Sequence, residues 1–383
     1  MIWRDLCPPF FARKNVTEML RTLLISVGIT NGIRAIFVCF IFTLCANAQT
    51  TSPVAAKDAA KEPTAKQKIA RWFEIEQLSL LTRYHFIEND NRVKAANNDQ
   101  YQFVGKFRFK FDKQGKYSVD TNIATGAAFT TFWNSTGIGT GSYQKDLNVR
   151  QLFFDAKPTK TIEIQFGGIY VNYGDATEVI TYDNDSYITG ERIQLRYPKK
   201  LYFDEVSVTF ASIGDFLRPN VFKRFEHLDV QNYHQFLVRK QLTKSVGVTA
   251  DYTFESGIDT FHQAVKIKIP PKKFIDTFLF ENYERVDPDR SYGFNIFGEK
   301  KLNKTFTASG GFADTNIKTL NSDRFLPGKR VYFNGQAKLS PEFSLLMQVT
   351  QGVGPIAPTL PRTRLDIILN YNILETLKRT KLF

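Results

Sequence analysis

The stretch that decides the fold runs from Gln100 to Phe129 and reads QYQFVGKFRFKFDKQGKYSVDTNIATGAAF. Apolar and polar residues alternate in it with a period of two, on both sides of a short segment at Lys113–Gly115. Successive side chains of a β-strand point to opposite faces, so this period predicts two strands. A short connection that contains glycine, placed between two such strands, predicts a β-hairpin.

The predicted hairpin has one apolar face and one polar face. The apolar parity includes Tyr101 and Phe107 and continues to Phe129, whereas the polar parity carries Lys106, Arg108, Lys110 and Asp120. We interpret the two strands as staves of a membrane barrel, because such strands are apolar towards lipid and polar towards a water-filled interior.

The position of the turn sets the register of this hairpin. Keeping Phe111 and Tyr117 on one face requires a three-residue turn with Gly115 in the left-handed conformation. The register then pairs Phe107 with Thr121, Phe109 with Val119, Lys106 with Asn122, Lys110 with Ser118 and Arg108 with Asp120. We therefore expect Arg108 to be paired, and Lys106 and Lys110 to be the freer charges.

Segments with the same alternation recur from Glu74 to Ile373. Each has about ten residues, which is the length a tilted strand needs to cross a membrane. Long connections, such as Thr130–Lys145 and Tyr173–Ser186, alternate with tight turns, such as Pro198–Lys200. This rhythm predicts an all-β protein, a transmembrane antiparallel β-barrel of about 16 strands, within a range of about 14–18. It has short periplasmic turns and longer extracellular loops.

A closed ring also follows from the cost of unpaired backbone groups. Hydrocarbon offers no hydrogen bonds, so an open sheet edge in a membrane would leave a row of N–H and C=O groups unsatisfied. A ring of this size is too wide for side chains to fill, so water occupies the interior. A soluble β-sandwich shares the alternation, but its topology gives no reason for the long and short rhythm.

The first 48 residues have the pattern of a cleaved secretory signal peptide. The apolar run Ala35–Leu44 follows Arg34 and is too short for an ordinary membrane helix. Ala46 and Ala48 supply the small residues of a cleavage site, and Met19 is a plausible alternative start. An uncleaved anchor, or a lipoprotein built on Cys45, are the weaker alternatives.

The rest of the chain divides into three expected parts. Residues 49–73 are rich in Ala, Lys and Thr and predict a flexible periplasmic leader. Residues 74–373 predict the barrel, and residues 374–383 a tail that ends in Phe383. All three cysteines, Cys7, Cys39 and Cys45, precede the expected cleavage site. The mature chain would then have no disulfide and no cysteine-based metal site.

The composition excludes some classes of function but does not identify a single one. The chain contains 35 Phe and 16 Tyr, yet 23% of its residues are charged and its net charge is +13. A basic balance allows nucleic acid, anionic surfaces or an anion-attracting pore as partners, but no nucleic-acid-binding motif is present. The four histidines lie on separate segments and no nucleophile-elbow or zinc-binding pattern occurs, so we expect neither an enzyme nor a cofactor.

The polar parity of the predicted strands supplies the candidate pore-lining residues. The basic ones are Arg83, Lys106, Arg108, Lys110, Arg192, Arg196, Lys266, Lys268, Arg330, Lys338 and Arg364. The acidic ones are Asp120, Glu163, Asp251, Glu255 and Asp366. A cationic excess in a narrow channel concentrates anions, which predicts anion preference. The alternative is that these groups form ion-pair ladders that stiffen the wall without selectivity.

With these features the chain resembles the bacterial outer-membrane porins, including the sixteen-stranded general and phosphate-selective families. The resemblance covers about residues 74–373 and rests on the signal peptide, the absence of cysteine from the expected mature chain, the strand rhythm and Phe383. It implies passive diffusion of small hydrophilic or anionic solutes, contact with outer-membrane lipid, and a possible homotrimer. It also implies recognition of Phe383 by the barrel-assembly machinery, although the polar segment Glu375–Lys381 departs from the family pattern. A structural or adhesive barrel, or an outer-membrane hydrolase, stay open as alternatives.

Overall fold

The computed structural model describes residues 72–129, 131–177, 187–197, 202–215, 217–270, 273–287, 290–315, 328–356 and 360–380. The expected signal peptide with Ala46 and Ala48, nearly all of the expected leader, and Phe383 lie outside the described residues.

Strands make up most of the described chain, and each overlaps a predicted segment apart from the short strand Asn134–Gly139, which lies within the predicted connection Thr130–Lys145. They are β1 (Phe73–Asn89), β2 (Lys94–Lys110), β3 (Tyr117–Thr125), β4 (Asn134–Gly139), β5 (Leu147–Ala156), β6 (Ile162–Tyr170), β7 (Tyr187–Arg196), β8 (Glu205–Ser212), β9 (Tyr233–Gln241), β10 (Val246–Glu255), β11 (Ile258–Lys268), β12 (Thr277–Asp287), β13 (Ser291–Lys301), β14 (Phe306–Thr315), β15 (Gly328–Lys338), β16 (Phe343–Gly352) and β17 (Pro361–Asn372). Two short helices, α4 (Val221–Phe225) and α5 (Ile373–Arg379), accompany them.

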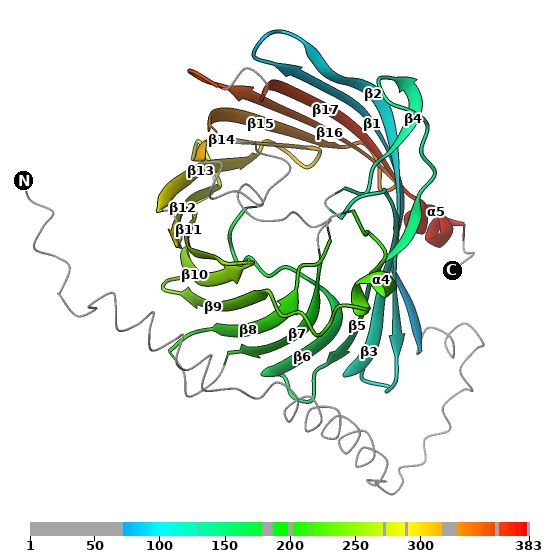
Figure 1. The fold of residues 1–383 in the computed structure, drawn as a ribbon, viewed down its shortest axis with the longest axis vertical. Helices are drawn as coiled ribbons and strands as arrows, with labels where there is room; N and C mark the ends of the chain where they lie inside the picture. Colours follow the sequence, from blue (N-terminus) through cyan, green and yellow to red (C-terminus); the bar gives the residue numbers. More distant parts are fainter. Residues whose placement is uncertain are drawn as a thin grey trace, which may run out of the picture. The chain divides into compact units, whose positions relative to one another are not determined.

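The strands close into a ring in which neighbours are antiparallel. Strand β17 pairs with β16 on one side and with β1 on the other, so the sheet has no open edge. Figure 1 shows this closure, with the red β17 beside the blue β1. The ring has 16 strands, because β4 is an additional short strand that pairs with β2 within the β3–β5 connection. The prediction of an antiparallel barrel of about this size is confirmed.

The β2–β3 hairpin has the predicted register. Arg108 pairs with Asp120 and Lys106 with Asn122 along the two strands. Gly115 has a φ of 66°, in the left-handed region that the turn was expected to require. Asp112 fixes the turn, since its carboxylate accepts hydrogen bonds from the backbone N–H groups of Gln114 and Tyr117, both at 2.8 Å.

The expected extension of the second hairpin strand to Phe129 is wrong. Strand β3 ends at Thr125, because Gly126 takes a φ of 104° and turns the chain out of the sheet. A side chain at Gly126 would collide with the backbone of Thr131 and Phe132, so only glycine fits this close approach. The segment that follows leaves the wall of the ring.

The two parities of the strands differ in exposure, as strand β1 illustrates. Leu80 and Tyr84 are 39% and 38% exposed, whereas Ser79 and Arg83 on the other parity are 2% and 8% exposed. The exposed parity is apolar and faces away from the ring. The buried parity is polar, and segments that fold into the interior cover part of it (Figure 1).

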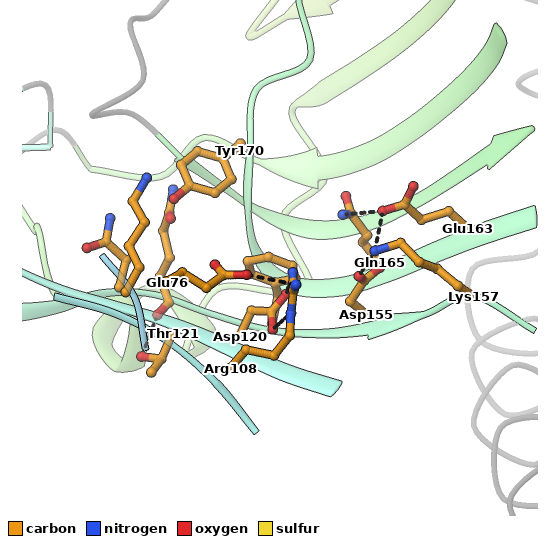
Figure 2. A pocket seen from close by; sticks show the side chains of 13 residues that line it. Glu76, Arg108, Asp120, Thr121, Asp155, Lys157, Glu163, Gln165 and Tyr170 are labelled. Atoms are coloured by element: carbon orange, nitrogen blue, oxygen red, sulfur yellow. Dashed lines mark hydrogen bonds and ion pairs between the residues drawn. The ribbon is translucent and has the colours of Figure 1, made fainter. Parts of the chain in front are cut away.

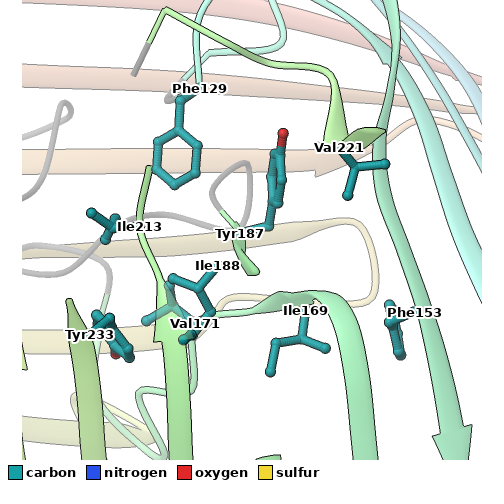
Figure 3. Close-up of a cluster of buried hydrophobic side chains, with 10 residues drawn as sticks. Phe129, Phe153, Ile169, Val171, Tyr187, Ile188, Ile213, Val221 and Tyr233 are labelled. Atoms are coloured by element: carbon teal, nitrogen blue, oxygen red, sulfur yellow. The ribbon is translucent and has the colours of Figure 1, made fainter. Parts of the chain in front are cut away.

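An apolar core sits inside the ring against β5 to β9. Figure 3 shows its side chains, which come from the strands and from the connections that follow β3, β6 and β8. Phe129 and Tyr187 pack together in this core with ring centroids 5.3 Å apart, and the guanidinium of Arg224 lies 4.4 Å from the Phe129 ring. The buried Arg150 donates to the carbonyls of Ala128, Phe129 and Thr131 and holds that connection in place.

The strand pattern ends where helix α5 begins, close to the expected limit at Ile373. Asn372 caps the helix by accepting a hydrogen bond from the backbone N–H of Glu375 at 3.3 Å. The helix packs against β1, and Arg379 forms an ion pair with Glu342 at 3.0 Å. Within the described ranges, no helix has the length and apolar character needed to cross a membrane.

Candidate functional site

The β2–β3 hairpin brings one predicted ion pair together on the inner parity. Arg108 Nε donates to Asp120 Oδ1 at 2.9 Å, and a terminal nitrogen of Arg108 donates to Asp120 Oδ2 at 3.0 Å. A third contact, which the sequence reasoning missed, joins Arg108 to Glu76 at 2.7 Å. The expectation that Arg108 is paired is confirmed.

The expectation that Lys110 is a free charge is wrong. Its Nζ lies 2.6 Å from a carboxylate oxygen of Glu74 on β1. The prediction failed because β1 begins at Phe73, several residues before the predicted segment. The first residues of β1 therefore place Glu74 and Glu76 on the inner wall. A β-bulge between Ile75 and Gln77 allows both carboxylates to reach the basic residues of β2.

Lys106 has no carboxylate within 4.0 Å among the described residues. Its ammonium group instead lies 5.1 Å from the centroid of the Tyr170 ring at the end of β6. A cation above an aromatic face is stabilised by the ring quadrupole, but it keeps its charge and its hydrogen-bond donors. Of the two lysines of this hairpin that were expected to be the freer charges, only Lys106 lacks a carboxylate partner among the described residues.

A second charged group lies on β5, β6 and β7. Lys157 contacts both Asp155 and Glu163, and Arg196 contacts the other oxygen of Glu163 at 2.7 Å. Gln165 donates to Glu163 at 3.3 Å. The charges of this group therefore neutralise one another within a few ångströms.

These two groups line one cavity of 210 Å³. Figure 2 shows Arg108, Asp120 and Glu76 in the middle of the lining, with the Asp155, Lys157 and Glu163 group on one side and Tyr170 on the other. Asn122 and Gln151, which pair with each other two residues beyond Asp120 and away from Asp155, also line the cavity, together with Phe153 and Tyr170. Of the predicted site residues, the cavity lining includes Lys106, Arg108, Asp120 and Glu163.

Another predicted group gathers around Asp366 on β17, away from this cavity. Its carboxylate contacts His85 Nδ1 at 2.5 Å, Arg364 Nε at 2.7 Å and Arg83 at 3.7 Å. The guanidinium of Arg83 also lies 4.2 Å from the Trp133 ring. Asp366 is thus surrounded by basic side chains of β1 and β17.

Two of the predicted arginines bind backbone carbonyls. Arg192 is buried and donates to the carbonyl of Tyr170 at 2.6 Å and to the hydroxyl of Thr209 at 3.0 Å. Arg330 donates to the carbonyl of Pro361 at 2.7 Å. Both side chains hold segments of the wall together, so their donors are already engaged.

The remaining predicted residues lie on the wall from β10 to β15. Asp251 contacts His262 Nδ1 at 2.7 Å, Glu255 is buried, and Lys266 reaches Asp175 at 3.3 Å. Exposed lysines end two of these strands beside short turns and have no carboxylate within 4.0 Å among the described residues; they are Lys268 and Lys338.

The segment Val171–Thr177, which follows β6, lies inside the ring. Asn172 accepts a hydrogen bond from Gln235 on β9, and Asp175 forms ion pairs with Arg239 on β9 and Lys266 on β11. These contacts place the segment across the inner face of the β9 to β11 wall. Sequence reasoning could not tell which connection folds inward, because a polar segment with glycine reads like any exposed loop.

The far end of this segment is fixed on β12 and β13. Glu281 is fully buried and accepts from the backbone N–H and the hydroxyl of Thr177, both at 2.5 Å. Asn295 donates to Glu281 at 2.7 Å and accepts from the Tyr332 hydroxyl at 2.8 Å. The hydrogen bonds of this network bind the segment firmly to the wall.

The described residues contain no cluster of three or more histidine, cysteine or carboxylate side chains that could hold a metal ion. What the described inner face offers is polar side chains, charged side chains and the cavity between them.

Comparison with known proteins bears on the fold. No family model matches the chain, and no curated protein matches it. OmpF of Salmonella typhi, solved in complex with daunomycin, shares the architecture with a TM-score of 0.53 and 8% identity over 78% of this chain and 97% of that chain. A triple mutant of the porin of Rhodopseudomonas blastica has a TM-score of 0.49 and 9% identity over 78% of this chain and 99% of that chain.

The structure and the comparison with OmpF together define the class of the fold. This is a closed 16-stranded antiparallel β-barrel with an apolar outer face and a polar inner face. Its fold is that of the bacterial porins.

Proposed function

We propose that the protein forms a channel in the bacterial outer membrane through which small hydrophilic solutes diffuse passively. The observation that carries the proposal is the division of the ring into an apolar outer face and a polar inner face. A closed ring of this kind satisfies its backbone in lipid and keeps polar side chains in contact with water. Catalysis plays no part in this function.

We further propose that the channel prefers anions. Three of the predicted basic residues, Lys106, Lys268 and Lys338, have no carboxylate within 4.0 Å among the described residues. Asp120 and Asp366, in contrast, each contact a basic side chain. Unpaired cations in a channel with low-dielectric walls raise the local concentration of anions.

The segment Val171–Thr177 would narrow this channel. It lies against the inner face of β9 to β13 and is fixed there by Asp175 and Glu281. A solute would pass between this segment and the opposite wall of β1 to β6, where the cavity lies.

The proposal also covers the export signal, the leader, the contact with lipid, the assembly of the barrel and its association into oligomers. Residues 1–48 would direct export and be removed, and the expected leader, which ends before β1 begins at Phe73, would lie on the periplasmic side. The outer face of the ring would contact outer-membrane lipid. The barrel-assembly machinery would recognise Phe383, and three copies could associate side by side.

A liposome-swelling assay tests this function. Proteoliposomes that contain the folded protein should swell in an iso-osmotic solution of a small sugar and should not swell in a large polysaccharide. Liposomes without protein provide the control. If the proteoliposomes swell in neither solution, the result contradicts the proposal.

A further inference from the structure

The inner wall of β2, β3 and β5 carries a row of three polar side chains at paired positions. Lys106 on β2 pairs with Asn122 on β3, and Asn122 pairs with Gln151 on β5. Neighbouring strands lie about 4.8 Å apart, so the row spans about 10 Å across the wall. All three side chains line the 210 Å³ cavity.

The two amides of this row are buried without partners. Asn122 is 1% exposed and Gln151 is fully buried. Neither the nitrogen nor the oxygen of either amide forms a hydrogen bond of acceptable geometry with the described residues, and a polar neighbour of Asn122 is the Tyr170 hydroxyl at the same cavity. A buried polar group without a partner costs about 1–3 kcal/mol, so two such amides side by side are costly for the fold alone.

Apart from Lys106 itself, the charged side chains beside the row form ion pairs with one another. Arg108 is paired with Asp120 and Glu76, and Lys157 is paired with Asp155 and Glu163; both groups lie on the same side of the row along the strands. The hydrogen-bonding capacity that is left in the row belongs to the two neutral amides and to the Lys106 ammonium. Each amide offers two N–H donors and a carbonyl acceptor, which together suit a hydroxyl group that both donates and accepts.

Aromatic surface lies beside these amides. Phe153 and Tyr170 both line the cavity, in an edge-to-face arrangement with ring centroids 6.4 Å apart. A sugar ring presents C–H groups on its faces and hydroxyls around its edge. Such a molecule fits a cavity that combines aromatic faces with unpaired amides, and small-ligand sites in general combine apolar surface with a few polar groups.

The volume limits the size of the ligand. A cavity of 210 Å³ is several times the roughly 30 Å³ that a water molecule occupies in the liquid, and it is smaller than a typical site for a drug-sized ligand. It therefore suits a single sugar ring or a short polyol.

We propose that the row of Lys106, Asn122 and Gln151, with Phe153 and Tyr170, is a binding subsite for an uncharged polyhydroxylated solute of monosaccharide size. Solute hydroxyls bond to the two amides and to the Lys106 ammonium, and the sugar face contacts the aromatic rings. This inference rests on the proposed channel function, because the subsite lies on the wall along which solutes would pass.

The variant Gln151→Leu removes both hydrogen-bonding atoms of one amide while it keeps nearly the same side-chain size. The fold should tolerate it, because an unpartnered buried amide contributes nothing that leucine lacks. Gln336→Leu on β15 is the matched control, since Gln336 has the inner parity and lies far from the cavity along the sheet. Both variants should show the heat-dependent shift in gel mobility of a folded barrel.

The experiment titrates glucose in two assays. In planar bilayers, glucose should reduce the ion current through the wild-type protein in a saturable way, and a polyethylene glycol of similar size should not. In isothermal titration calorimetry on the detergent-solubilised protein, glucose should release or absorb heat with a saturable isotherm. Gln151→Leu should weaken both effects about tenfold, as expected for the loss of one or two hydrogen bonds, and Gln336→Leu should leave them unchanged.

The outcomes separate the subsite from the channel. Ohmic current with no saturable effect of glucose, together with flat calorimetry, would overturn the subsite and leave the channel intact. Saturable calorimetric binding that Gln151→Leu weakens, in a protein that gives no current, would support the subsite and overturn the channel. Equal binding of glucose by the wild type and by Gln151→Leu would overturn the assignment to this row.

Discussion

Arg108 and Asp120 face each other across the β2–β3 hairpin and share two hydrogen bonds, at 2.9 Å and 3.0 Å. Such a two-bond pair is geometrically specific, because both nitrogens of the arginine fork meet both oxygens of one carboxylate. It fixes the register of the hairpin on its polar face, and it leaves Lys106 as the hairpin's cation without a carboxylate partner among the described residues.

The first prediction concerns this pair. Asp120→Asn should lower the free energy of unfolding by about 1–3 kcal/mol, because a neutral amide cannot replace two charge-assisted hydrogen bonds to arginine. The variant also removes one negative charge from the inner wall, so its reversal potential in a salt gradient should move towards anions. Urea unfolding and bilayer recordings measure the two effects. An unchanged free energy of unfolding would show that the pair sets the hairpin register without adding to the stability of the fold.

The second prediction tests the assignment of the two faces at adjacent positions. Phe107 lies on the outer face and stacks on Phe73 with ring centroids 6.0 Å apart. Phe107→Arg should destabilise the barrel by about 2 kcal/mol, since a charge on the lipid face costs about 2–4 kcal/mol at the bilayer midplane and less towards either interface. Phe107→Leu is the size-related control and should cost much less. Folding into lipid vesicles at increasing urea concentration measures the difference.

The third prediction concerns the inner neighbour of that residue. Lys106→Gln should leave the stability nearly unchanged, because the side chain has no carboxylate partner among the described residues to lose. It should reduce the anion preference, as measured by the reversal potential in a salt gradient. Lys304→Gln, in the exposed turn between β13 and β14, removes the same charge outside the ring and provides the control. If Lys106→Gln and Phe107→Arg have the same effect on folding, the faces have been assigned wrongly.

The fourth prediction concerns the segment Val171–Thr177. Glu281→Gln replaces a carboxylate that accepts two hydrogen bonds from Thr177 with an amide that accepts them more weakly. The segment should then leave the wall more often, and single-channel recordings should show more frequent transitions between current levels. Glu299→Gln on β13 is the control, because Glu299 has the inner parity and no described ion-pair partner. Equal current noise in both variants would show that Glu281 does not restrain the segment.

Much of the fold could be predicted from the sequence, because strand periodicity repeats along the whole barrel. Only Val104 and the turn interrupt the alternation between Tyr101 and Val119, so the pattern predicts the hairpin register to the residue, and the structure has that register. The alternation ends at helix α5 close to the expected Ile373. Features that break the period were missed, such as the glycine at position 126 that ends β3 and the bulge at Glu76.

The candidate site was less predictable, since it depends on contacts between residues far apart in sequence. Lys110 could be placed on the inner face by its parity, but its pairing with Glu74 required the true start of β1. The inward segment Val171–Thr177 depends on partners such as Lys266 and Glu281, about a hundred residues further along the chain. The sequence pattern did not indicate that Asn122 and Gln151 line one cavity, because only the pairing of β3 with β5 brings the two residues together.

The measurement that tests the central claim most directly is the ion current of the purified, folded protein in a planar lipid bilayer. A water-filled ring predicts stepwise insertion events, each with a stable current proportional to the applied voltage. The absence of such steps would contradict the account, provided that the same preparation shows β-sheet circular dichroism and heat-dependent gel mobility.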